Sequence, residues 1–174
     1  TSTGKHIRTT GNHPYFVKKP IPAISGTFEV DQSHRLEDLS KDSFIAIANL
    51  KHSFVARISK EEKRRAFAHY KKAPKKFGPV LWARTIAYLV NEFSIRGVKL
   101  ILDEEYKGYE PLIRQVIDSL TSKVSVSFRA VGKNSPAHFA AYAANPSAKG
   151  NKNPTGALSL RQVAEGVLHP ELTG

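Results

Sequence analysis

Three short runs rich in Phe, Ile and Val follow one another early in the chain and determine what the later segments can pack against. They cover residues 27–30, 43–50 and 53–58, and their composition is typical of strands. Three strands in close succession predict an antiparallel meander. The 174 residues suffice for one domain of ordinary size with a real core, so we expect a single domain with tails.

The segment that follows the meander has the pattern of a capped helix. Ser59 and Glu62 have the spacing of a capping box, which predicts a helix that begins near Lys60 and stops before Pro74. Pro79 is expected to open a second helix, because proline is well tolerated at the start of a helix.

This second helix is expected to be the main core helix, because its apolar residues recur at the spacing of one buried face. Gly97 is expected to end it. Residues 97–102 then form a short apolar run, which predicts an interior strand of the sheet. The residues of the buried helical face are Trp82, Ile86, Leu89, Val90 and Phe93.

Helical and strand patterns alternate in the rest of the chain. Residues 109–122 carry an apolar helical stripe, and residues 123–131 alternate as a half-buried strand does. Ser135 is placed to cap a helix with a proline at its first position. Ser159 and Gln162 have capping-box spacing and predict a last helix.

This order of elements predicts an α/β domain whose mixed sheet contains the meander and then strands joined through helices, with helices on its faces. We divide the chain into a basic extended arm at 1–25, the α/β domain at 26–145, and a loop with a C-terminal helix at 146–174. Ligands of such sheets bind at the carboxyl ends of the strands, so the residues that end strands are candidate site residues.

Two of the predicted strands end on an acid, Asp31 after "TFEV" and Asp103 after "GVKLIL". Aspartate is also a common turn residue, which would explain Asp31 without any function. If the two strands are parallel neighbours, however, both carboxylates project from one edge and repel each other. A Mg²⁺ or Mn²⁺ ion would relieve that repulsion and would leave room for substrate phosphates. Asp31 and Asp103 are therefore the predicted catalytic and metal-binding residues.

The chain resembles the ribonuclease H-like superfamily, and within it the uncharacterised domains whose first strand ends in an Asp-Glu-Ser pattern. The resemblance rests on "VDQS" at 30–33, on Asp103 after the fourth strand, and on "VSFRAVGKNSPAHFAAYAA", which is similar to the last strand and terminal helix of that family. It extends over roughly residues 27–145 and implies a ribonuclease H-like sheet and metal-dependent cleavage of nucleic acid.

The chain departs from the family pattern at two places. Gln32 stands where the first motif usually has Glu, and Ala140 and Ala141 stand where the terminal helix usually has an Ala-Asp pair. A third metal ligand must therefore come from elsewhere. The candidates are Glu104, which we include in the predicted metal site, and Glu105, Glu165 and His138.

The charge balance points to a polyanionic partner. Twenty-seven Lys and Arg residues against fifteen Asp and Glu residues give a net charge of +12, which favours nucleic acid over an acidic protein or an anionic membrane. No run approaches the ~20 apolar residues of a bilayer helix, and the first residues lack the apolar core of a secretory signal. The absence of cysteine excludes thiolate zinc sites. We expect a cytoplasmic protein that does not enter a membrane.

Residues 60–76 are the strongest candidate for nucleic-acid contact. They contain eight cations and only two acids, Glu61 and Glu62, for a net charge of +6. Such a run can be a solvated face, but its mutual repulsion would be relieved by a phosphate backbone. The predicted contacts are Lys60, Lys63, Arg64, Arg65, Lys71, Lys72, Lys75 and Lys76, together with Lys18 and Lys19 of the N-terminal arm.

Two functional hypotheses remain open. The first is a divalent-metal nuclease in which Asp31 and Asp103 hold the ion and the Lys-rich segment grips the substrate. The second is a binder of structured RNA, or a ribosome-associated protein, that keeps the fold without catalysis. The strand-end acids favour the enzyme, whereas the basic arm and the missing aspartate favour the binder.

Overall fold

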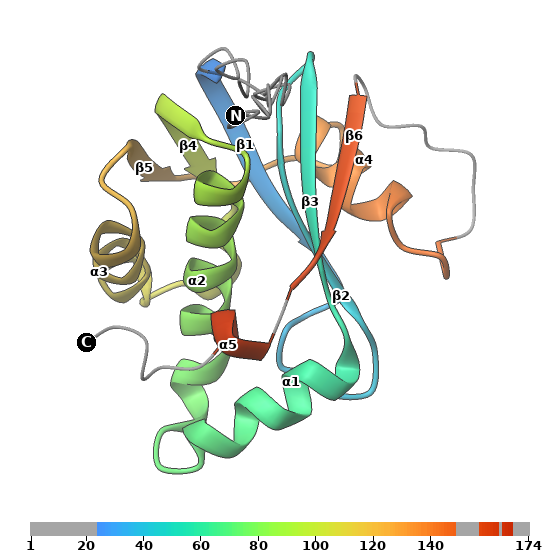
Figure 1. The fold of residues 1–174 in the computed structure, drawn as a ribbon, viewed down its shortest axis with the longest axis vertical. Helices are drawn as coiled ribbons and strands as arrows, with labels where there is room; N and C mark the ends of the chain where they lie inside the picture. The colour runs from blue at the N-terminus through green and yellow to red at the C-terminus, as the bar shows by residue number, and fades with distance from the viewer. Residues whose placement is uncertain (1–23, 149–156, 164, 169–174) are drawn as a thin grey trace, which may run out of the picture.

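The computed structural model describes residues 24–148, 157–163 and 165–168, and in them six strands form one mixed sheet (Figure 1). The strands lie in the order β5-β4-β1-β2-β3-β6. Their bounds are Ile24–Ser33 for β1, Ser43–Ala48 for β2, His52–Ile58 for β3, Ile95–Leu102 for β4, Val124–Phe128 for β5 and Ala157–Gln162 for β6.

The predicted meander and the mixed sheet are both confirmed. β1 pairs with β2 and β2 pairs with β3 in antiparallel fashion. β4 pairs in parallel with β1 on one side and with β5 on the other, so residues 98–102 lie in an interior strand as expected. Since β3 runs in the same direction as β1, the ends of β1, β3, β4 and β5 meet at one edge of the sheet.

Helices cover both faces of the sheet. Figure 1 shows α2, α3 and α5 on one face, which we call the α2 face, and α4 on the other, which we call the α4 face. The helices are α1 at Lys60–Phe67, α2 at Phe77–Glu92, α3 at Glu110–Leu120, α4 at Pro136–Ala143 and α5 at Glu165–Leu168, and 3₁₀ turns occupy Ala68–Tyr70, Pro74–Lys76 and Glu104–Tyr106.

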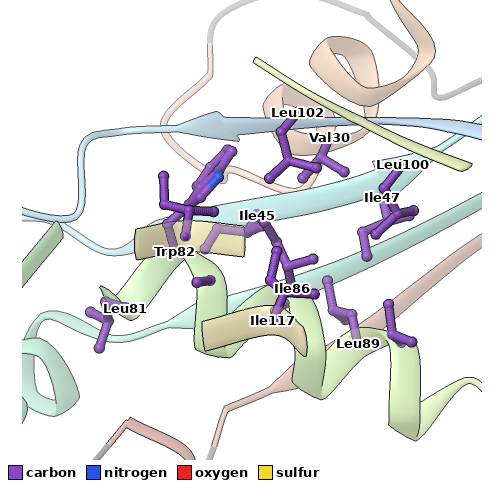
Figure 2. Close-up of a cluster of buried hydrophobic side chains, with 14 of the residues drawn as sticks. Val30, Ile45, Ile47, Leu81, Trp82, Ile86, Leu89, Leu100, Leu102 and Ile117 are labelled. Atoms are coloured by element: carbon purple, nitrogen blue, oxygen red, sulfur yellow. The ribbon is translucent and has the colours of Figure 1, made fainter. Parts of the chain in front are cut away.

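The α2 face holds the larger core. Figure 2 shows Trp82, Ile86 and Leu89 of α2 packed beneath strand residues such as Val30 and Leu100. All five are fully buried. Phe93 is half-buried and its ring lies 4.6 Å from the ring of Phe54. The predicted burial of Trp82, Ile86 and Val90 against the sheet is confirmed.

The α4 face is built from smaller side chains. Ala137, Ala140 and Ala141 of α4 pack against the alanines of β2, together with Phe44 and Val55. Ser135 caps α4 as predicted, because its side chain accepts a hydrogen bond from the His138 N–H at 3.0 Å. Alanine side chains let the helix backbone approach the strands closely, so this face is thin.

The basic helix, α1, begins at the residue that the capping box predicts. The core helix, α2, does not begin at its predicted residue. Ser59 Oγ accepts from the Glu62 N–H at 3.1 Å and starts α1 at Lys60. By contrast α2 begins at Phe77, two residues before Pro79, because the first helical turn tolerates proline at several positions. Its end at Glu92 precedes Gly97, which instead lies within β4 with a φ of 63°.

The prediction that Ser159 caps the last helix is wrong. Ser159 lies in strand β6, where it is opposite Phe54 of β3, and the capping-box spacing with Gln162 has no structural role. The exposed edge of β3 provides hydrogen-bonding groups that local sequence cannot reveal, and pairing with it overrides helix propensity. A short helix, α5, follows at Glu165–Leu168.

Within the portion of the chain that the structure describes, no helix combines the length and the apolar character needed to cross a bilayer.

Candidate functional site

The two strand-end acids lie side by side, as the sequence predicts. Val30 is opposite Leu102 in the parallel pair of β1 and β4, and the Asp103 N–H donates to the Val30 carbonyl at 3.0 Å. Val30 and Leu102 point into the core of the α2 face. Because side chains alternate along a strand, Asp31 and Asp103 are turned to the α4 face.

Asp31 is a buried carboxylate whose two oxygens are both engaged. Only 7% of the residue is exposed. Oδ1 accepts from the Gln32 N–H at 2.7 Å, and Oδ2 lies 2.9 Å from His138 Nδ1. Burial raises the pKa of Asp31, and the nearby charge of Asp103 adds to the rise, while the hydrogen bonds from Gln32 and His138 oppose it. Burial and the charge of Asp103 therefore favour the protonated form of Asp31, whereas its two hydrogen bonds favour the ionised form.

His138 is brought to Asp31 by the first turn of α4. Its side chain keeps 27% exposure, and its ring stacks at 6.3 Å on Tyr142, one turn later in the helix. When Asp31 is ionised it can only accept a hydrogen bond, so Nδ1 carries the proton. Nε2 is then the nitrogen that can take up or release a proton, as in other acid–histidine pairs.

Asp103 lies beside this pair and organises the chain between β5 and α4. Its Oδ1 accepts from the Val131 N–H at 2.7 Å. That bond holds the connection which leads from β5 to Ser135, the cap of α4. Asp103 therefore helps to determine where α4 begins, and so where His138 lies relative to Asp31.

Gln32, which departs from the family motif, does not belong to this site. It points to the opposite face, where its Nε2 lies 3.5 Å from the Tyr106 hydroxyl. That hydroxyl donates to Glu37 Oε2 at 3.2 Å. A Cβ on Gly78 would clash with this Glu37 carboxylate and would lie 2.7 Å from Cε1 of the buried Tyr106 ring, so a larger residue would fit only if these side chains shifted. In the motif "VDQS", Asp31 therefore points to the α4 face and Gln32 to the opposite face of the sheet.

The other acids considered as third ligands lie away from Asp31. Glu104 pairs with Lys107 at 3.4 Å, and Glu105 pairs with Arg35 at 2.9 Å. Glu165 begins α5, a helix that packs on the α2 face. His138 is the one candidate, among those weighed from the sequence, that the described structure brings into contact with Asp31.

The donor set in this arrangement does not fit the Mg²⁺ or Mn²⁺ ion that two strand-end acids predict. Across residues 24–148, 157–163 and 165–168, no three His, Asp or Glu side chains gather where they could hold a metal ion. Asp31 has both oxygens hydrogen-bonded, and Glu104 is turned to Lys107. The site is better described as a buried carboxylate paired with an imidazole.

The prediction that Lys63 contacts nucleic acid is wrong, because Lys63 is fully buried and cannot reach a phosphate. Its Nζ donates to Ser43 Oγ at 2.8 Å and to the carbonyls of Arg35 and Asp38. Burial lowers the pKa of Lys63 to about 8, against the opposing charges of Asp38 and Asp42. Lys63 therefore fastens the loop between β1 and β2 to α1 rather than contributing to a nucleic-acid surface.

The other seven cations of residues 60–76 lie on the surface to different degrees. Lys60 is half-exposed and lies 4.0 Å from Glu61, and Arg65 pairs with Glu62 at 3.2 Å. The remaining five, Arg64, Lys71, Lys72, Lys75 and Lys76, are exposed. Tyr70 and Phe67 pack inward against the core. Lys18 and Lys19 lie outside the described residues.

The Asp31–His138 contact is difficult to predict from the sequence, because 107 positions separate the two residues. The signal that was available is the capped helix at 135, which places His138 in a first turn near the strand ends. Comparison of the chain with protein-family models, with curated proteins and with solved structures gave no match. Its function is therefore inferred from the site.

Proposed function

We propose that this protein binds nucleic acid through the exposed cations of residues 60–76, on a sheet of the ribonuclease H-like kind. The observation that carries the proposal is the cluster of Lys71, Lys72, Lys75 and Lys76, all exposed, within six residues that contain no acid. Four like charges so close together repel one another, and a phosphate backbone relieves this repulsion while releasing its own counterions. The net charge of +12 supports the same class of partner.

The position of the basic segment supports this proposal. β3 ends at Ile58, at the same edge of the sheet as Asp31 and Asp103, and α1 begins two residues later. A strand that followed the cations of α1 would therefore approach the edge where the acid–histidine pair lies. Polar contacts at strand ends are typical of ligand sites in α/β sheets.

Two features support the ribonuclease H-like assignment. The antiparallel meander is followed by strands joined through helices, which is the order that the resemblance implies. Asp31 in the first strand and Asp103 after the fourth are neighbours, as the family pattern requires. The terminal helix contributes His138 to this pair instead of an aspartate.

A second candidate function is hydrolysis of the bound phosphodiester, favoured by the 2.9 Å contact of His138 Nδ1 with Asp31 Oδ2. His138 Nε2 would accept a proton from water as the water oxygen forms a bond to phosphorus. The bond to the leaving oxygen breaks, and that oxygen then takes up a proton from solvent, while His138 releases to solvent the proton it accepted. Asp31 would orient the imidazole and stabilise its charged form.

Binding is tested with the quadruple variant K71Q/K72Q/K75Q/K76Q, by fluorescence anisotropy with labelled single-stranded RNA and duplex DNA. The matched control, K51Q/K99Q/K107Q/K123Q, removes the same charge from exposed lysines elsewhere. We expect the first variant to lose at least tenfold in affinity and the control to lose much less. Equal losses would mean that only net charge matters, and unchanged binding would refute the proposed surface.

Hydrolysis is tested on RNA, DNA and hybrid substrates with Mg²⁺, with Mn²⁺ and with a chelator. Asp31→Asn and His138→Gln should abolish cleavage, whereas Asp118→Asn, an exposed acid on α3, should retain it. Cleavage in chelator would support the acid–histidine mechanism. Cleavage that requires a metal would mean that the site rearranges to bind one, and intact substrates in every condition would leave the protein as a binder.

A further inference from the structure

A separate pocket of about 470 Å³ lies where the loop after β1, the start of α1 and the end of α4 meet. Its size is within the range of small-molecule binding pockets. The residues that line it include Lys41, Lys60, Ser147, His34 and Asn145. The mechanism and the cation cluster at 71–76 make no use of this pocket.

The residues that line the pocket include more cations than acids. Lys41 and Lys60 are among them, with Lys60 Nζ also 4.0 Å from Glu61 Oε1, and the acid in the lining, Asp42, is paired with Arg57. Arg57 donates to Asp42 Oδ2 through two nitrogens, at 2.7 and 3.0 Å, and the Lys60 N–H donates to Oδ1 at 2.9 Å. Two lysines beside a carboxylate that has its own arginine favour an anionic ligand.

The walls of the pocket are tied to each other by side-chain hydrogen bonds. His34 has a φ of 63°, which is uncommon for a residue with a side chain, and its Nδ1 contacts the Asp42 carbonyl at 3.0 Å. Asn145, only 7% exposed, contacts His34 Nε2 at 3.3 Å and Ser33 Oγ at 3.2 Å. The Asn145 side chain also accepts from the Ser147 N–H at 3.0 Å. These bonds hold loop and helix end in one arrangement around the cavity.

The pocket and the Asp31–His138 pair lie at opposite ends of α4. His138 lies in the first turn of α4, and Asn145 follows the last residue of the helix, Ala143, by two positions. The five-residue step from His138 to Ala143 alone rises by about 8 Å along the helix, so phosphates bound at the two ends would belong to different nucleotides of a strand.

We propose that this pocket binds a phosphate group, the phosphate being that of a nucleic-acid strand of which a different phosphate lies at Asp31 and His138. The inference rests on the proposed function, because it places the same strand. The chemistry it assigns is narrower: Lys41, Lys60 and the Ser147 hydroxyl recognise phosphate oxygens. A terminal or free phosphate monoester presents the same oxygens, so the test has to separate the two sources.

The test compares K41Q/K60Q with the matched double variant K51Q/K99Q, using RNA of two and of eight nucleotides, a mononucleotide and inorganic phosphate. For the octamer we expect K41Q/K60Q to weaken binding about tenfold and to lower the slope of log affinity against log salt by roughly 2, one for each lost contact. The control should leave both unchanged. The dinucleotide is too short to span both sites, so its affinity should change little.

The arms separate the outcomes. Equal sensitivity of the mononucleotide and inorganic phosphate to K41Q/K60Q would support a phosphate site that takes a free monoester instead of a strand. Octamer binding that K41Q/K60Q does not affect, while K71Q/K72Q/K75Q/K76Q abolishes it, would overturn the pocket and leave the proposed function intact. Binding unaffected by either variant would overturn both. Circular dichroism melting of each variant confirms that it is folded.

Discussion

The two faces of the sheet are built from different residues, with large apolar side chains on the α2 face and small side chains on the α4 face. On the α2 face, Trp82, Phe28 and the aliphatic side chains around them fill a wide core and are completely buried. On the α4 face, alanines of α4 meet alanines of β2, and polar groups lie among them. Large apolar side chains contribute stability in proportion to the area they bury, so the α2 face stabilises the fold.

The thinner face has a geometric consequence. Because Ala137, Ala140 and Ala141 carry no bulk beyond Cβ, α4 lies close enough to the strands for His138 to reach Asp31 at 2.9 Å. A face packed with leucines would separate the helix from β1 and break this contact. The face with little hydrophobic stabilisation is therefore the one on which charged groups are brought together.

Trp82→Ala should produce the largest loss of stability. The side chain is fully buried at the centre of the α2 face, and removing it deletes contacts and leaves a cavity. We expect the free energy of unfolding to fall by about 3–5 kcal/mol, measured by urea denaturation with circular dichroism. A loss below about 1 kcal/mol would show that the α2 face is not the main source of stability.

Lys63 provides a test at a buried charge, through the pH dependence of unfolding. Its folded pKa of about 8 lies below the ordinary lysine value of 10.5, so the unfolded chain binds more protons between these values. Stability relative to Lys63→Met should therefore rise by about 3 kcal/mol between pH 8 and pH 10.5. The same comparison with Lys76→Met, at a lysine whose side chain is exposed, is the matched control.

Ala140→Leu is expected to break the α4 face with a moderate loss. Overpacking a close helix–sheet contact destabilises by about 1–3 kcal/mol and forces α4 outward. We expect the Nδ1 proton of His138, seen by nitrogen-15 NMR in contact with Asp31, to exchange faster or vanish. Ala143→Leu in the same helix, where the side chain is only half-buried, is the control and should preserve the signal. An intact contact in Ala140→Leu would contradict the role of small residues.

Asp31→Asn should have the smallest effect on stability, and one that depends on pH. The folded pKa of Asp31 is raised above its ordinary value of 3.8, so the folded protein binds more protons just above that value and loses stability as pH rises through the folded pKa. The asparagine variant lacks this loss. Its stability relative to the native protein should therefore increase with pH from about 4 upward, and a flat difference would contradict the burial of the carboxylate.

The sequence was sufficient where one local pattern determined the outcome. The capping boxes at Ser59 and the cap at Ser135 predicted the starts of α1 and α4, and the apolar stripe of α2 predicted the core. It failed at Ser159, where the partner strand, β3, supplied the hydrogen bonds and a strand formed instead of a helix. Local propensity cannot report a partner that is distant in sequence.

The same limit applies to the site. Asp31 and Asp103 could be predicted as neighbours, because two parallel strands that end on acids must place them at one edge. The burial of Lys63 could not be predicted from its place in a run of cations, because the acceptors that surround it come from the loop after β1 and from the first residue of β2. The pairing of His138 with Asp31 depends on how closely α4 approaches the sheet. The alanines of α4 permit this close approach, but their presence in the sequence does not predict it.

Amide chemical shifts mapped during titration with an RNA octamer test whether nucleic acid lies along residues 60–76 and the edge of the sheet beside α4, as proposed. We expect the largest changes at residues 60–76, in the loop at 34–42 and around His138 and Asn145, with α3 unaffected. Changes confined to α3 and β5, or to residues 1–23, would contradict the account and place the nucleic acid elsewhere.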